Sequence, residues 1–334
     1  MVKVTRVAVA SAPVRTRMLT IVVLSLGLLA LFVRVPGAEA SVFWANFNNA
    51  TGTTIGRANN NGTGAMPFVG GADGPCGVAV DASYLYWANW AFGSTPTIGR
   101  VNLEGLPVPE QSFIPAGGPA PCGVAVDGAH VYWANTGFGA GTTIGRADID
   151  GGNPDPGFIG GASGPCGVAV DDTYIYWANN AAGSIGRATL DGVTVEPSFI
   201  PNAGPLPCGV AVDDMHVYWA NSFGGTTVQR AKLDGSNVEP FVTDAISPCG
   251  VAVSQGVVYW ANIGDGTIGR APADGNGVEL PSFIETANSP CGVAVSANAV
   301  PANVPAMSSY ALLLALVVLS GIAARRVSLA RRAG

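Results

Sequence analysis

The stretch GPCGVAVDDTYIYWAN at residues 164–179 decides the fold, because close copies of it recur along most of the chain. Its Pro-Cys-Gly triplet occurs six times, at a mean interval of about 43 residues. The six cysteines of this triplet are Cys76, Cys122, Cys166, Cys208, Cys249 and Cys291. Self-similarity at a fixed period is the signature of a repeat architecture, so the chain is predicted to contain six similar units.

Two further sequence motifs repeat with the same period. The word Trp-Ala-Asn, preceded by an aromatic residue, contains Trp44, Trp87, Trp133, Trp177, Trp219 and Trp260. The word Ile-Gly-Arg-Ala, or a close variant, contains Arg57, Arg100, Arg146, Arg187, Arg230 and Arg270. The chain thus contains six copies of each of three motifs, which supports the prediction of six repeat units.

Each unit is predicted to form four short strands. Gly-Val-Ala-Val alternates branched with tiny side chains, which suits an innermost strand crowded by neighbouring backbone. The aromatic and β-branched residues around Tyr-Trp-Ala-Asn suit a second, half-buried strand. Ile-Gly-Arg-Ala is expected to form the third strand. An Asp-Gly pair then supplies a turn, and the fourth strand ends with Phe-Ile or Phe-Val. Four strands in about 43 residues is the size of one β-propeller blade.

The order of these motifs resembles the YWTD repeat, also called the LDL receptor class B repeat. The resemblance covers about residues 41–296 and implies an all-β, six-bladed β-propeller with four-stranded blades. One departure is an asparagine where that family usually has aspartate, at Asn46, Asn89, Asn135, Asn179, Asn221 and Asn262. An amide donates and accepts hydrogen bonds whereas a carboxylate only accepts, so different bonding is expected at this position.

The two ends of the repeat region complement each other. The first unit begins at its Trp-Ala-Asn motif and has no Gly-Val-Ala-Val strand before it. The last unit ends at Gly-Val-Ala-Val and has no Tyr-Trp motif after it. We therefore expect residues 293–295 to pair antiparallel with residues 42–44 and to close the ring.

Charge is distributed unevenly along the 334 residues. Of 16 basic and 22 acidic residues, nine basic but only one acidic residue lie outside residues 41–298. The predicted propeller therefore carries a net charge near −14 and should repel phosphate backbones, so nucleic acid is not an expected partner.

The N-terminal 40 residues have the pattern of a secretory signal peptide. A basic leader precedes an apolar run at residues 18–33 and then Ala38-Glu39-Ala40, a pattern typical of signal peptidase cleavage sites. We expect a mature chain that starts at Ser41; a retained anchor helix is the alternative. The expected domains are thus a signal peptide at 1–40, a propeller at 41–298, and a C-terminal segment at 299–334.

The C-terminal segment combines a proline-containing linker, an apolar run at residues 311–324 and an arginine cluster. With the residues from Ala306 onward, the run approaches the ~20 residues that span a bilayer. The segment is similar to the IPTL-type sorting signals of Gram-negative bacteria, with Val-Pro-Ala-Met-Ser in place of Ile-Pro-Thr-Leu-Ser. That resemblance implies processing by an exosortase-like membrane protease and a location in the cell envelope or outside the cell. An ordinary membrane anchor is the alternative.

The six cysteines allow three interpretations. They could pack as small buried residues, form disulfides between neighbouring units, or provide a ring of functional thiols or metal ligands. Because equivalent residues share one geometry, neighbouring cysteines should be close everywhere or nowhere. We expect innermost strands around a channel to keep their Cα atoms more than about 7 Å apart, which leaves six reduced, buried thiols.

The remaining candidate residues mostly follow the repeat. The six arginines are expected to pair with aspartates or with backbone carbonyls inside or between units. His130 and His216 stand where Tyr84 and Tyr174 stand in other units, so neither is expected to be catalytic. Trp90 and Phe92 depart from the repeat and are candidates for a partner contact.

These observations predict an exported, non-catalytic binding or scaffold protein. Its partner would be an unidentified protein or glycan, and no catalytic residue, cofactor or metal site is expected. The alternative is a propeller enzyme, such as a metal-assisted lyase or lactonase, with its site at the mouth of the channel.

Overall fold

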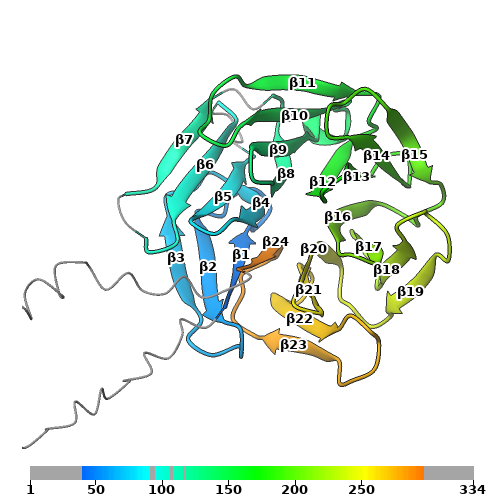
Figure 1. Ribbon diagram of the computed structural model, residues 1–334. Helices are drawn as coiled ribbons and strands as arrows, with labels where there is room; N and C mark the ends of the chain where they lie inside the picture. The colour runs from blue at the N-terminus through cyan, green and yellow to red at the C-terminus, as the bar shows by residue number, and fades with distance from the viewer. Residues whose placement is uncertain (1–39, 91–94, 106–107, 116–117, 297–334) are drawn as a thin grey trace, which may run out of the picture. The chain divides into compact units, whose positions relative to one another are not determined.

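The computed structural model describes residues 40–90, 95–105, 108–115 and 118–296, which form an all-β, six-bladed propeller (Figure 1). Each blade is a four-stranded antiparallel sheet. Among these residues, no helix is long and apolar enough to cross a membrane. The predicted signal peptide and C-terminal sorting segment lie outside the described residues.

The strands occupy four concentric positions in the blades. The innermost strands are β24 (Pro290–Val295), β4 (Pro75–Val80), β8 (Pro121–Val126), β12 (Pro165–Val170), β16 (Pro207–Val212) and β20 (Pro248–Ser254). The second strands are β1 (Ser41–Asn46), β5 (Tyr84–Asn89), β9 (His130–Asn135), β13 (Tyr174–Asn179), β17 (His216–Asn221) and β21 (Val257–Asn262). Gly-Val-Ala-Val is thus innermost and Tyr-Trp-Ala-Asn second, as the sequence predicted.

The outer half of each blade has the same regularity. The third strands are β2 (Thr54–Asn59), β6 (Thr97–Asn102), β10 (Thr143–Asp148), β14 (Ser184–Thr189), β18 (Val228–Lys232) and β22 (Thr267–Pro272). The rim strands are β3 (Met66–Gly70), β7 (Glu110–Pro115), β11 (Asp155–Gly160), β15 (Val195–Ile200), β19 (Glu239–Val242) and β23 (Leu280–Ile284). One short 3-10 helix, η1 (Gly137–Gly139), follows β9.

The ring closes through the chain ends, as predicted from the incomplete first and last units. β24 pairs antiparallel with β1, with Val42 opposite Val295 and Trp44 opposite Val293. The first blade therefore consists of β24, β1, β2 and β3. In Figure 1, orange β24 lies beside blue β1 at the centre of the propeller.

The hydrophobic core lies between successive blades. The tryptophans of β5, β9, β13, β17 and β21 are fully buried, and each packs in a cluster that combines side chains of two neighbouring blades. In every blade except the one with Trp219, a glycine of the third strand lies opposite the second-strand tryptophan, Trp44 of β1 included, and a Cβ there would overlap the indole ring: Gly56, Gly99, Gly145, Gly186 and Gly269. Because each blade buries its large side chains only against its neighbours, the closed ring is needed to complete the core.

Candidate binding site at the cysteine face

The six cysteines lie in a circle where the innermost strands begin, at the end of the propeller that we call the cysteine face. They form three disulfides, Cys76–Cys122, Cys166–Cys208 and Cys249–Cys291. The bonded Cα atoms are 4.9 to 5.0 Å apart. The prediction of reduced thiols with Cα atoms more than about 7 Å apart is therefore wrong.

The glycine that follows each cysteine explains the close approach. The six glycines form their own circle, and a Cβ on any of them would overlap the backbone of the next inner strand; at Gly292 it would lie 2.7 Å from the carbonyl oxygen of Cys76. Without side chains at this position the strands approach closely enough to bring neighbouring cysteines into disulfide range. Each disulfide consequently joins the innermost strands of two neighbouring blades.

Five of the six cysteines, all except Cys76, line one side of a pocket of about 320 Å³. The register of each blade explains its walls: Pro75 pairs with Asn89, so the residue after the repeated asparagine lies at the same end as the cysteines. This residue differs among the blades, whereas the words around it repeat. Phe47, Trp90, Thr136, Asn180 and Ile263 occupy this position and line the pocket, together with Phe138 and Phe223 from the following residues.

Aromatic contacts organise the pocket wall. The ring of Trp90 meets Phe47 edge to face at a centroid distance of 5.7 Å and Phe138 at 5.5 Å. Phe138 and Phe223 keep 62% and 68% of their surface exposed. Two large apolar side chains therefore border the pocket without being buried by the protein itself, which favours contact with a ligand.

The polar groups of the pocket are uncharged. Thr136 Oγ1 donates to the carbonyl of Pro165 at 2.6 Å, and Asn180 Nδ2 donates to the carbonyl of Pro207 at 3.3 Å. Trp90 Nε1 has no hydrogen-bond partner among the described residues. The wall thus combines aromatic surface with a few hydrogen-bonding groups, and no lysine, arginine, histidine, aspartate or glutamate is among its described residues.

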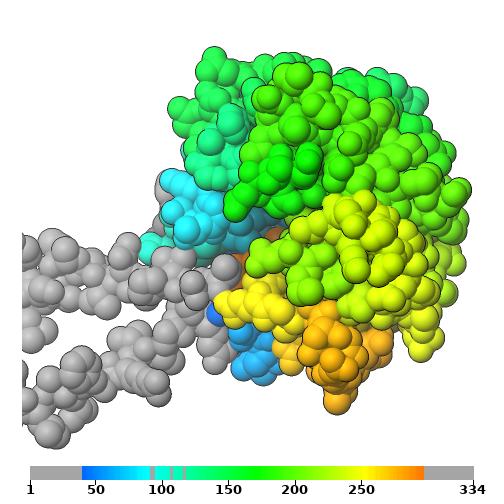
Figure 2. Space-filling model, turned by 45° about the vertical axis from the view of Figure 1, so that its right-hand side comes forward, coloured from blue at the N-terminus to red at the C-terminus, as the bar shows by residue number. Residues whose placement is uncertain are grey.

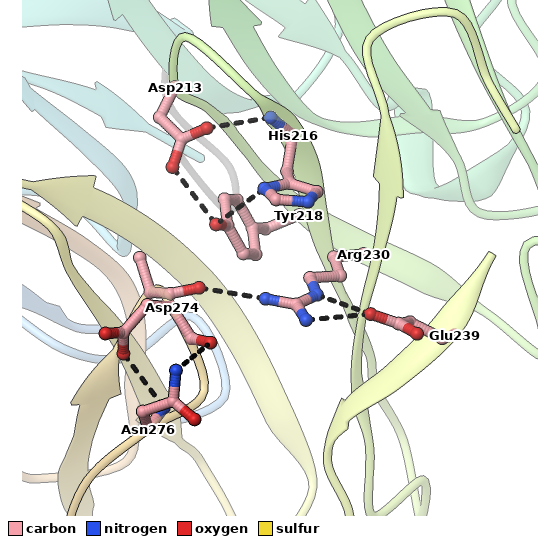
Figure 3. A network of polar contacts seen from close by, with 8 residues as sticks. Asp213, His216, Tyr218, Arg230, Glu239, Asp274 and Asn276 are labelled. Carbon is pink, nitrogen blue, oxygen red and sulfur yellow. Dashed lines mark hydrogen bonds and ion pairs between the residues drawn. The ribbon is translucent and has the colours of Figure 1, made fainter. Parts of the chain in front are cut away.

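The opposite end of the channel, the aspartate face, has a different lining. The Val-Ala-Val residues of the six innermost strands border a cavity of about 180 Å³ there. The aspartates that follow four of these strands are engaged in the turns: Asp213 Oδ1 accepts from the backbone N–H groups of Met215 and His216, and Oδ2 accepts from the Tyr218 hydroxyl at 3.0 Å (Figure 3). The repeated aspartates therefore stabilise turns and do not border the described channel.

Asp81, Asp127 and Asp171 make the same contacts with Tyr86, Tyr132 and Tyr176. Burial first, and the neighbouring carboxylate second, raise the pKa of each of the four tyrosines. His130 and His216 lie in these turns, each with Nδ1 3.4 Å from the adjacent tyrosine hydroxyl.

The repeated arginines lie between blades near the rim. Arg230 pairs with Glu239 at 2.8 Å and donates to the carbonyl of Ala273 in the next blade (Figure 3). Arg146, Arg187 and Arg270 also donate to a carbonyl of the following blade, and their carboxylate partners, where present, are glutamates rather than aspartates. Stacking on a rim phenylalanine completes the arrangement, for example 3.8 Å from Arg187 Cζ to the Phe199 ring centroid. These four arginines link blades, whereas Arg57 donates to Ser41 Oγ and Arg100 pairs with Glu110 within their own blades. None of the six is among the described residues that line either end of the channel.

Of the two candidate contact residues, Trp90 lies in the pocket, and Phe92 lies outside the described residues. Phe47, Phe138, Phe223 and Ile263 also line the pocket and were not predicted from the sequence. A usable signal was present, because an aromatic or branched apolar residue follows the repeated asparagine in three of the six units, at a position that the repeat does not maintain.

Comparison with known proteins supports the fold. No protein-family model matches the sequence, and no curated protein sequence matches it significantly. Among solved structures, a chain from a nidogen/laminin complex is similar with a TM-score of 0.64 and 19% identity, over 77% of this chain and 98% of that one. Streptogramin B lyase is similar with a TM-score of 0.53 and 18% identity, over 78% of this chain and 88% of the lyase. At these identities the likeness concerns the fold of the chain, a six-bladed β-propeller.

Proposed function

We propose that this protein is an exported, non-catalytic binding protein whose ligand site is the pocket at the cysteine face. The observation that carries the proposal is the break in the repeat just after the repeated asparagine, where Phe47, Trp90 and Ile263, with Phe138 and Phe223 from nearby residues, converge beside the cysteine ring. A volume of about 320 Å³ is within the range of small-molecule sites.

The chemistry of the wall selects the ligand. Trp90, Phe138 and Phe223 offer ring faces and edges, and the described wall carries no charge to pair with an ionic group. Glycans bring many hydroxyl groups that this wall cannot satisfy, and burying an unpaired hydroxyl is costly. The ligand therefore presents an uncharged apolar or aromatic group, either as a small molecule or as a side chain of a protein partner.

Titration with the neutral fluorophore N-phenyl-1-naphthylamine tests this site. We expect saturable binding to one site per chain, and a loss of at least tenfold in affinity in Phe223→Asp, because a charge at the pocket border opposes burial of an apolar ring. Val193→Asp is the control, since Val193 is 80% exposed and is not a pocket residue. Equal binding by both variants would show that the fluorophore binds elsewhere.

A propeller enzyme is the competing function, and the similarity to streptogramin B lyase gives it support at the level of the fold. A metal-assisted lyase or lactonase needs acids, bases or metal ligands that converge at the channel mouth. The described channel ends are lined instead by apolar residues, oxidised cysteines, threonine and asparagine. Stoichiometric divalent metal in the oxidised protein after purification would favour the enzyme.

Export and processing form part of the same proposal. A leader removed before Ser41 and a C-terminal segment recognised by an exosortase-like protease fit the oxidised cysteine ring, because disulfides persist in exported compartments. Mass spectrometry of envelope and medium fractions should find chains that begin at Ser41. An intact chain in the cytoplasm would contradict the proposal.

A further inference from the structure

We propose that the cysteine ring, once reduced, is a binding site for thiophilic metal ions such as Cu⁺, Zn²⁺ and Cd²⁺. The proposal does not depend on the ligand of the pocket. It rests on the position of the six sulfur atoms and on the groups that surround them.

The first observation is the spacing between sulfurs that are not bonded to each other. Each cysteine has one disulfide partner and one unbonded neighbour, and the unbonded Sγ atoms are 3.7 Å apart for Cys76 and Cys291, 3.9 Å for Cys122 and Cys166, and 3.5 Å for Cys208 and Cys249. Two thiolates on one tetrahedral zinc ion, each with a Zn–S bond of ~2.3 Å, are about 3.8 Å apart. The three unbonded pairs of neighbouring sulfurs therefore already have the spacing of ligands that share an ion.

The second observation is that sets of three sulfurs converge. The Sγ atoms of Cys76, Cys122 and Cys291 all lie within 4.8 Å of one another, and so do those of Cys208, Cys249 and Cys291. Each set includes one disulfide, Cys76–Cys122 or Cys249–Cys291, which reduction converts into two thiols. Three converging thiolates are a sufficient ligand set for a soft metal ion, with water or a fourth sulfur completing the shell. The two sets share Cys291, so the convergence is strongest on the side of the ring that contains this residue.

The third observation is that the backbone holds the sulfurs together without the disulfides. Pairing within each blade and the close contacts of Gly77, Gly123 and their equivalents fix the inner strands. Reduction removes the covalent links but not these contacts, so the thiols stay adjacent and the site is preorganised.

The surroundings favour a soft metal ion over other cations. The ring is buried among apolar groups such as Phe47, Trp90 and Ile263. The residues that line the ring and the pocket above it include no carboxylate, the ligand type that Ca²⁺ and Mg²⁺ prefer. They include no lysine or arginine either, so a bound metal ion supplies the positive charge that buried thiolates need.

The chemistry has two balanced steps. A dithiol reductant gives two electrons and two protons to each disulfide, which becomes two cysteine thiols while the dithiol becomes a disulfide. Each thiol that then ligates a metal ion loses its proton to solvent, so binding releases one proton per thiolate and strengthens as pH rises. The oxidised ring has no thiolate and should not bind.

The test uses Cd²⁺ and the folded protein in two redox states. The protein is reduced with a phosphine, freed from it under oxygen-free conditions, and titrated while ultraviolet absorption of cadmium–thiolate bonds is recorded. We expect saturable binding with at least three thiolates per ion in the reduced protein, no such band in the oxidised protein, and no competition by Ca²⁺. Equal absorption in both states, or loss of β-sheet circular dichroism on reduction, would overturn the proposal.

Two triple variants separate a ring site from independent thiols. Replacing Cys76, Cys122 and Cys166 by alanine leaves Cys208, Cys249 and Cys291, which are consecutive in the ring. Replacing Cys76, Cys166 and Cys249 by alanine also leaves three cysteines, but no two of them are ring neighbours. The first variant should bind Cd²⁺ at least tenfold more tightly than the second. Equal affinities would show that the ring arrangement contributes nothing.

Discussion

At the scale of the residue, the repeated asparagine connects three strands and a loop of one blade. Asn179 is 1% exposed; its Oδ1 accepts from the backbone N–H of Ser163 and from Trp177 Nε1. Its Nδ2 donates to Ser184 Oγ and to the carbonyl of Pro197. A carboxylate could reproduce the first two bonds and could accept from the Ser184 hydroxyl, but it could not donate to the Pro197 carbonyl, which explains why an amide suits this blade.

Asn179→Asp should therefore destabilise the propeller. The carboxylate would face the Pro197 carbonyl with no proton to donate, and leaving such groups unpaired costs about 1–3 kcal/mol. Denaturant unfolding at pH 7 measures the loss. The penalty should shrink at acidic pH, because a protonated carboxyl can donate again.

Asn61→Asp is the matched control. The Asn61 side chain is exposed, and its Oδ1 accepts from the backbone N–H and the hydroxyl of Thr63. A carboxylate keeps both bonds, so this variant should unfold at nearly the wild-type denaturant concentration. A similar loss in both variants would contradict the role assigned to Asn179.

At the scale of the element, the packing of second against third strands in five blades places a glycine opposite a tryptophan. A Cβ on Gly186 would overlap the indole ring of Trp177. The fifth blade has Gln229 at this position, and there Trp219 donates to the carbonyl of Ala203 instead of to the repeated asparagine. The Trp219 indole thus differs from those of Trp87 and Trp177, which donate to the repeated asparagine of their blades.

Gly186→Ala should lower the free energy of unfolding by about 1–3 kcal/mol, the usual cost of overpacking a filled core. Gly160→Ala in β11 is the control, because a Cβ there has no atom within 4 Å. Thermal unfolding of both variants decides the matter: comparable midpoints would mean that the indole can move aside.

The turns between first and second strands predict how stability depends on alkaline pH. Burial and the nearby aspartate raise the pKa of Tyr86, Tyr132, Tyr176 and Tyr218 above the ~10 of an unfolded chain. The neutral phenols thus contribute stability that is fully present below about pH 10 and is lost as pH rises through the folded-state pKa.

Tyr176→Phe should reduce this alkaline loss, because it removes one of the four titrating phenols. At pH 7 the same variant should be less stable by about 1–2 kcal/mol, since the hydrogen bond to Asp171 is lost. Tyr174→Phe keeps that bond and serves as control. Unfolding free energies measured from pH 8 to 11 would refute the argument if Tyr176→Phe and wild type fell in parallel.

At the scale of the whole molecule, the blades meet in a closed ring that is hollowed at its centre (Figure 2). The ring is closed twice, by the pairing of β24 with β1 and by the disulfide between Cys249 in β20 and Cys291 in β24. A chain that ends at residue 289 lacks both closures. It should unfold without a cooperative transition, whereas a chain that ends at residue 298 should unfold like the full-length protein. Equal cooperativity in calorimetry would show that closure is dispensable.

Much of this architecture could be predicted from the sequence because each blade repeats the same sequence motifs. The motifs that are present predicted the number of blades and the order of the strands. The motifs that are missing at the two ends predicted the closure by residues 293–295. The oxidation state of the cysteines was not predicted correctly. It depends on the distance between inner strands, which is set by the glycine beside each cysteine, and the effect of that glycine appears only when the strands lie side by side. The pocket was mostly missed because its residues, such as Phe47 and Ile263, occupy the position that does not repeat.

The most direct test of the binding site is to locate a ligand in a crystal of the oxidised protein. A neutral brominated naphthalene can be soaked in and its bromine found by anomalous scattering. We predict one dominant bromine site on the cysteine face, in contact with Trp90 and Phe223 and above the sulfur ring. A dominant site at the aspartate face or between the rim strands, or no ordered bromine at saturating probe, would contradict the account.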